Sequence, residues 1–196
     1  MHPLLEPGRT LAPGEFEAFV GDREEAGDIN HYELLNGRIV VTPPAGWPHG
    51  SHEATLVRQI GNHVEEGGLG RVFGSSQGYV FPTGDIVEPD VAFVSTARWR
   101  AAPAPEEGKF LRLVPDLLVE ILSKKTRSRD LGEKKGIYER NGVGEYWLVD
   151  SRRRRVIRLV LRDGRFDLGT TFDAGTVFES EVLAGLSIDL AALFAD

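Results

Sequence analysis

The stretch "PDLLVEILSKKTRSRD", residues 115–130, decides the fold and raises the first chemical question. Its first half is a nearly continuous apolar run, which predicts a central strand buried in a sheet. Glu120 lies inside this run, and an ionised carboxylate in such a place is costly unless something pairs with it. We therefore expect a cationic partner for Glu120, either a basic side chain or a metal ion.

The segments before this strand alternate between helical and strand patterns. Residues 14–26 predict a short helix, and "HYELLNGRIVVTPP" predicts two strands joined at Asn36-Gly37, the strongest short hairpin signal. Residues 49–66 suit a second helix, which Gly67-Gly68 would end. Residues 97–109 contain two prolines and predict an exposed loop.

The segments after this strand complete an α/β pattern. Residues 129–141 predict a helix closed by Asn141-Gly142, followed by the buried strand "EYWLVD" and by a hairpin through Asp163-Gly164. A helix therefore connects two central strands. We predict an α/β fold, a mixed β-sheet flanked by helices, with an N-terminal helix and β-hairpin.

Length and composition indicate an ordinary globular protein. The chain has 196 residues, 41% hydrophobic and 27% charged, which predicts one domain over residues 1–196 with residues 1–14 as an N-terminal extension. The absence of cysteine excludes disulfides and thiolate metal sites. No apolar run is long enough for a membrane span, and no signal pattern opens the chain, so we expect no membrane contact and a cytoplasmic location.

Two acidic residues stand at the ends of predicted central strands. Asp90 opens the strand in "EPDVAFVS", and Glu120 lies late in "LLVEIL". If these strands are neighbours, the two carboxylates converge, and a divalent cation would relieve their repulsion. Mg²⁺ suits two carboxylates because it keeps several waters and leaves room for phosphate oxygens. Taken singly, Asp90 is also explained as a strand-entry residue after Pro89, and Glu120 as one half of a salt bridge to an arginine.

The predicted helix after Glu120 carries a lysine on a shared face. Asp130, Lys134 and Tyr138 are spaced at i, i+4 and i+8. The start of this helix should pack near the strand end, where Lys134 could stabilise an attacking hydroxide and the charge that builds on phosphorus. An ordinary Asp–Lys pair on a solvated face is the alternative.

Several motifs resemble a known family. "EPD" at residues 88–90, followed by "VEIL", resembles the PD-(D/E)XK nuclease pattern. More specifically, "YELLNG", "PHG", "EPDVAFVS", "PDLLVEILS", "TRSRDLGEKKGIY" and "NGVGEYWLVD" resemble the Uma-two family of restriction-endonuclease-like proteins, from about residue 15 to the C-terminus. The resemblance implies a restriction-endonuclease-like core that cuts DNA phosphodiester bonds with Mg²⁺ or Mn²⁺.

The resemblance also implies site residues. Asp90 and Glu120 would be the metal ligands, and the Ile121 carbonyl would be a third. The general pattern places a lysine two residues after the acid, where this chain has Leu122. In the family the following helix supplies that lysine, which matches Lys134.

Other residues that match the family leave alternatives open. Lys135 and Lys124 are possible substitutes for Lys134, and Lys124 stands where the family commonly has proline. Glu33 in "YELLNG" would be a further catalytic residue, as a ligand or an orienting base, or else a surface ion pair. His49 is expected near the cleft.

The expected partner is DNA, although the net charge of −7 argues against a basic coat over the whole surface. The basic run should contact the DNA backbone through Lys124, Lys125, Arg127, Arg129 and Lys135. A homodimer is expected because cutting both strands requires two sites.

Two rival interpretations remain. A zinc site would need His49, His52, Glu53 or His63, but "HEATL" lacks the second histidine of the zinc-protease motif. The fold could also persist in a non-catalytic module that binds nucleic acid or supports assembly. In such a module we would expect Glu120 to be bridged to an arginine.

Overall fold

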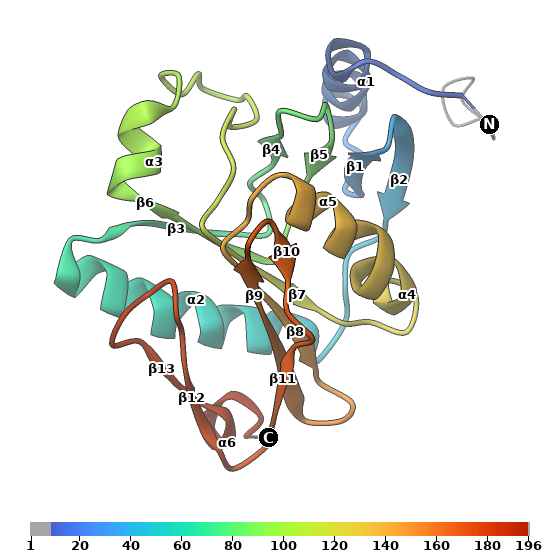
Figure 1. Cartoon of the computed structure of the whole chain (residues 1–196). Helices are drawn as coiled ribbons and strands as arrows, with labels where there is room; N and C mark the ends of the chain where they lie inside the picture. Colours follow the sequence, from blue (N-terminus) through green and yellow to red (C-terminus); the bar gives the residue numbers. More distant parts are fainter. Residues whose placement is uncertain (1–8, 196) are drawn as a thin grey trace.

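A mixed seven-stranded sheet forms the centre of the computed structural model, which describes residues 9–195 (Figure 1). Its main strand order is β10-β9-β8-β7-β6-β3, and β11 pairs with β9. β7 and β8 are parallel, and the other neighbours are antiparallel. The strands are β3 (Gly70–Gly74), β6 (Val91–Ser95), β7 (Leu117–Ile121), β8 (Glu145–Asp150), β9 (Arg155–Arg162), β10 (Arg165–Phe166) and β11 (Thr170–Asp173). The predicted α/β fold with a mixed sheet is confirmed.

The two faces of this sheet are covered by different elements. Residues 117, 119 and 121 of β7 pack with α2 (His49–Gly67) and with a C-terminal unit of β12 (Val177–Glu179), β13 (Ser187–Asp189) and α6 (Leu190–Leu193). Residue 118 packs on the other face, against α5 (Lys135–Arg140) and against a smaller sheet that is described next. Because side chains alternate along a strand, Glu120 belongs to the α5 face.

A smaller sheet stands beside the α5 face. Its order is β2-β1-β5-β4, with β1 (His31–Leu35), β2 (Arg38–Thr42), β4 (Tyr79–Val80) and β5 (Ile86–Val87). Asn36 and Gly37 both have positive φ, 51° and 76°, as the predicted two-residue hairpin requires. The predicted N-terminal helix is α1 (Pro13–Glu25), whose Phe16 and Phe19 pack on this sheet. Residues 1–8 of the expected extension lie outside the described residues.

The segment expected to be a loop at residues 97–109 begins as a helix instead. α3 (Thr96–Ala101) starts at Ser95, whose hydroxyl accepts from Arg98 N at 3.3 Å. The Arg98 guanidinium donates to the carbonyls of Val114, Pro115 and Gly142 and pairs with Asp116. Both prolines follow Ala102, so they end the helix without disrupting it.

The helical connection between β7 and β8 has three parts. α4 (Arg127–Arg129) leads into the π-helical turn η2 (Asp130–Lys134), which continues as α5. Asp130, Lys134 and Tyr138 are all buried, so the predicted shared face is turned toward the sheet. Gly142 ends the segment with φ of 77°.

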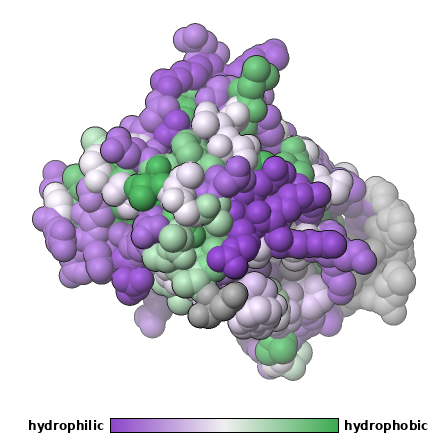
Figure 2. Space-filling view, turned by 90° about the horizontal axis from the view of Figure 1, so that it is seen from below, coloured by the Kyte–Doolittle hydropathy of each residue, from purple (hydrophilic) through white to green (hydrophobic). Residues whose placement is uncertain are grey.

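None of the described helices combines the length and the apolar character needed to span a bilayer. Large exposed hydrophobic side chains, such as Trp47 and Leu168, lie far apart in the sequence. Figure 2 shows one face, on which hydrophilic residues surround smaller hydrophobic areas.

Candidate active site

The register of β6 and β7 brings the two predicted acids together. Val91 pairs with Val119 and Ala92 with Leu118, so one further antiparallel step sets Asp90 opposite Glu120. Residues directly opposite in an antiparallel pair project from the same face. Asp90, Glu120 and Lys134 all line one cavity of about 160 Å³. The two acids therefore converge as expected from the sequence.

Glu120 is compensated by a buried lysine. Its Oε1 accepts from Lys134 Nζ at 2.5 Å and from the Tyr138 hydroxyl at 2.6 Å. The Lys134 side chain is only 2% exposed. No arginine forms an ion pair with Glu120 within residues 9–195, so the salt bridge considered from the sequence is made by a lysine.

Glu33 is a second acidic partner of the Lys134 ammonium. Its Oε1 lies 2.7 Å from Lys134 Nζ and accepts from the Glu88 backbone N–H at 3.1 Å. Arg129 Nη2 lies 3.8 Å from Glu33 Oε2 and donates to Thr42 Oγ1 at 3.0 Å. Because Glu33 is buried in this network, it is not the surface pair that its hairpin position also allowed.

Each acid uses only one of its two oxygens for hydrogen bonds in the described part of the chain. Asp90 Oδ2 accepts from Ile121 N at 2.6 Å and lies 3.2 Å from His49 Nε2, and Glu120 uses Oε1 for both of its partners. Within residues 9–195, no hydrogen bond involves Asp90 Oδ1 or Glu120 Oε2. Two carboxylate oxygens are thus available to a cation, beside Ile121, which also lines the cavity.

A second set of ligand atoms shares Asp90. One ligand atom each of His49, Glu53 and Asp90 lies within 4.8 Å of the others. His49 and Glu53 are one turn apart at the start of α2, which is the spacing that puts two side chains on one helix face. The other suggested histidines lie elsewhere, since His52 Nδ1 is 2.8 Å from Ser151 Oγ and His63 Nε2 is 3.2 Å from the Ala184 carbonyl oxygen.

The electrostatics of the cavity favour added positive charge. Five carboxylate residues line it, against the two permanent cations Arg129 and Lys134. Burial raises the pKa of the Glu120 and Glu88 carboxyls. Burial alone would lower the pKa of Lys134, but Glu120 and other nearby carboxylates outweigh it and the pKa is raised. The pKa of His49 is likewise raised, because Asp90 and Glu53 outweigh its burial. Such a surplus of negative potential fits a divalent cation.

Among the lysines considered for the site, Lys134 is the one that lines the acid cavity. Lys124 is exposed on a neighbouring groove, and Lys135 is half-buried at the start of α5. Leu122, at the position where the general pattern has lysine, is buried in the core of the α5 face.

The predicted DNA-contacting residues fall into different environments. Lys124 and Lys125 are exposed on a groove of about 550 Å³, and Arg129 lines both this groove and the acid cavity. Arg127 Nη1 is held 2.6 Å from Asp150 Oδ2. Its charge is therefore partly satisfied within the protein.

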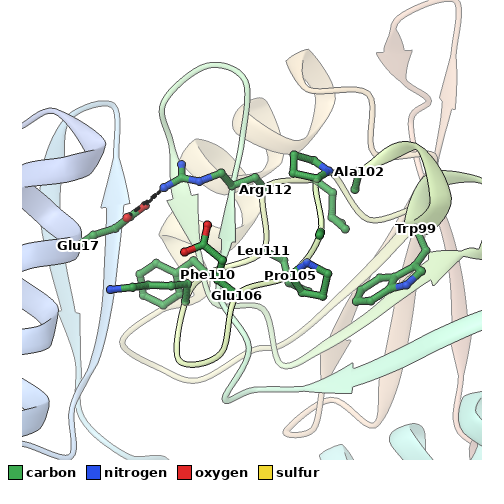
Figure 3. Close-up of a pocket in the computed structure, with 12 residues that line it drawn as sticks. Glu17, Trp99, Ala102, Pro105, Glu106, Phe110, Leu111 and Arg112 are labelled. Carbon is green, nitrogen blue, oxygen red and sulfur yellow. Dashed lines mark hydrogen bonds and ion pairs between the residues drawn. The ribbon is translucent and has the colours of Figure 1, made fainter.

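Another cavity, of about 130 Å³, has a different character (Figure 3). Trp99, Phe110 and Leu111 supply apolar surface, and Arg112 Nη2 pairs with Glu17 Oε1 at 2.9 Å. Glu17 belongs to α1, so this pair fastens the segment after α3 to the N-terminal helix. The acid cavity is the better candidate for hydrolytic chemistry.

Comparison with known proteins gives a family and a related fold. The family described as "Uma2: Putative restriction endonuclease" matches residues 15–191. The chain is also similar to a crystal structure of "a putative nuclease belonging to DUF820 from Anabaena variabilis ATCC 29413", with a TM-score of 0.69 and 21% sequence identity, covering 83% of this chain and 89% of that one. At this identity the likeness shows a shared fold. No functionally curated protein matches the chain.

Proposed function

The chain belongs to the Uma2 family, and from that premise we propose that it is an endonuclease that hydrolyses DNA phosphodiester bonds with Mg²⁺ or Mn²⁺. The observation that carries the proposal is the convergence of Asp90, Glu120 and Lys134 on one cavity, with Lys134 Nζ 2.5 Å from Glu120 Oε1. In a non-catalytic module we expected Glu120 to pair with an arginine. It pairs with Lys134, which supports a nuclease instead.

The free oxygens of Asp90 and Glu120 would hold the cation, with the Ile121 carbonyl as a third ligand. A bound divalent ion polarises the phosphate and acidifies a water molecule. Lys134 stays protonated because its carboxylate neighbours raise its pKa, so it acts as a fixed positive charge and not as a base. That charge stabilises the negative charge that develops on the phosphate as the P–O ester bond breaks.

Glu33 and Tyr138 act as positioning residues. Glu33 pairs with the Lys134 ammonium in addition to Glu120, and Tyr138 fixes the Glu120 carboxylate through its hydroxyl. Both hold their partners before substrate arrives, which reduces the reorganisation needed in the transition state.

The ligand set of His49, Glu53 and Asp90 bears on which metal is preferred. Imidazole suits transition ions, whereas Mg²⁺ prefers oxygen ligands. We therefore expect Mn²⁺ to bind more tightly than Mg²⁺, and His49→Ala to reduce that preference. Isothermal titration of each ion into the wild type and this variant measures it.

The substrate contacts follow from the exposed bases. Lys124, Lys125 and Arg129 would contact the DNA backbone, with Lys135 further along the helix and Arg127 limited by its pair with Asp150. We propose that residues 1–196 form one domain and that two copies act together on the two strands. Light scattering with and without duplex DNA tests the dimer.

Cleavage of a supercoiled plasmid tests the function. Wild-type protein should nick the plasmid with Mg²⁺ or Mn²⁺, and Asp90→Asn, Glu120→Gln and Lys134→Met should each lose this activity. Glu25→Gln, an exposed acid at the end of α1, is the matched control and should cut normally. Full activity in Asp90→Asn, or metal-independent cutting by the wild type, would overturn the proposal.

A further inference from the structure

The groove beside the acid cavity is built from two loops. Residues 42–48, at and after the end of β2, line it together with residues 122–126, which follow β7. The groove and the cavity share eight lining residues: Thr42, Pro43, Pro44, Ala45, His49, Ile121, Thr126 and Arg129. A polymer lying in the groove therefore leads directly to the two convergent acids.

Trp47 is exposed in this groove. It is 84% exposed, whereas Trp147 is fully buried against Phe178, and Trp99 stacks with Phe73 and contacts the Arg71 guanidinium. Within residues 9–195, Trp47 makes no ring–ring or cation–π contact. A large aromatic side chain stabilises a fold when it is buried. Because Trp47 is exposed, it does not contribute to the stability of the fold in this way.

The charge of the groove is opposite to that of the cavity. Three basic residues, Lys124, Lys125 and Arg129, line the groove, and no Asp or Glu does so in the described part of the chain. The adjoining cavity has five carboxylate residues. The basic groove can bind an anionic polymer. The adjoining acidic cavity can bind the metal ion that would act on one of the phosphates of that polymer.

We propose that Trp47 is a stacking platform for an unpaired base of the nucleic-acid strand, whose phosphates lie along Lys124, Lys125 and Arg129. The identity of the polymer rests on the proposed function. In a duplex both faces of an internal base are covered by its neighbours, so Trp47 selects a single-stranded, frayed or extruded nucleotide. The platform holds that strand where the next phosphates can enter the acid cavity.

Tryptophan fluorescence of the full chain in EDTA tests this inference without cleavage. The ligands are oligothymidylate of about ten nucleotides and an abasic strand of the same length, which has the phosphates but no bases. Oligothymidylate should quench the wild-type emission, and Trp47→Phe should abolish most of the quenching. Trp99→Phe is the matched control and should retain it.

Affinities measured with labelled strands supply the second readout. Trp47→Ala should weaken oligothymidylate binding about tenfold, since stacking contributes roughly 1–3 kcal/mol per base. Its affinity for the abasic strand should equal that of the wild type. Oligouridylate, titrated in parallel, supports the inference if Trp47→Ala weakens its binding too, and it shows whether the sugar matters.

The outcomes separate the inference from the proposed function. Equal wild-type affinity for the abasic strand and oligothymidylate would overturn the inference, as would the same quenching by polyglutamate, because an acidic peptide would then be the ligand. Quenching without any plasmid cleavage supports the stacking site while hydrolysis fails. If the wild type cleaves the plasmid but Trp47→Ala binds oligothymidylate as tightly as the wild type does, the stacking site alone is overturned.

Discussion

Replacement of Lys134 by methionine tests the ion network most directly. The Lys134 ammonium lies 2.5 Å from Glu120 Oε1 and 2.7 Å from Glu33 Oε1, in a side chain that is 2% exposed. Methionine fills a similar volume but leaves two buried carboxylates without their cation. Removal of one partner from a buried pair costs about 3–5 kcal/mol. We therefore expect Lys134→Met to lose that much unfolding free energy at pH 7, measured by urea denaturation followed by circular dichroism.

The direction in which the stability deficit of Lys134→Met changes with pH also follows from the structure. Burial raises the pKa of Glu120 in the folded state, so the folded protein gains stability relative to the unfolded chain as pH falls and that carboxyl takes up a proton. Without Lys134 the pKa should rise further, and the deficit of Lys134→Met should shrink between pH 8 and pH 5. Lys134 itself does not titrate in this range, because both its folded and its unfolded pKa lie well above pH 8, so the change with pH comes from its carboxylate partners.

A second substitution supplies the control. Glu120→Gln in the Lys134→Met background removes one stranded charge and should restore part of the lost stability. A deficit below about 1 kcal/mol, the range of an exposed salt bridge, would refute the reasoning. A deficit that grows as pH falls would refute it as well.

Four further predictions concern the surrounding fold. Tyr138→Phe removes the hydroxyl on Glu120 and should cost about 1–3 kcal/mol in urea denaturation, with weaker Mn²⁺ binding by calorimetry. Gly70→Ala should lower the melting temperature by several degrees, because its Cβ would lie 2.1 Å from the Val94 carbonyl oxygen. Arg98→Ala frees three backbone carbonyls, so amide exchange in α3 should become faster. Calorimetry should show a single unfolding transition if the chain is one domain, and two resolved transitions would contradict this.

The parts of the fold that local chemistry determines could be predicted from the sequence. The apolar run around Glu120 defined a central strand, and Asn36-Gly37 defined a hairpin because both positions adopt positive φ. α3 was missed because its stability comes from tertiary contacts: Arg98 reaches carbonyls as far away as Gly142. No local pattern in residues 97–109 reports those contacts.

The candidate site shows the same limit. Asp90 and Glu120 could be paired because each lies at the end of a recognisable strand, and the spacing of Lys134 and Tyr138 gave a shared helix face. The contribution of His49 and Glu53 depends on where the start of α2 sits relative to β6, which single-sequence periodicity does not encode. Their spacing of four residues was the one available signal.

Lys134 lies on the segment that connects β7 to β8 and not on a strand. The site is therefore complete only when this segment has docked on the sheet. Glu120 meets Lys134 only after the η2 turn has docked, and the hairpin helps to hold that turn because Asn36 and Arg38 both donate to Glu133. Under the proposed function, a chain still emerging from the ribosome, or one partly unfolded, has the acids without the ammonium. Under that function, we expect such a chain not to cleave DNA until the η2 turn has docked.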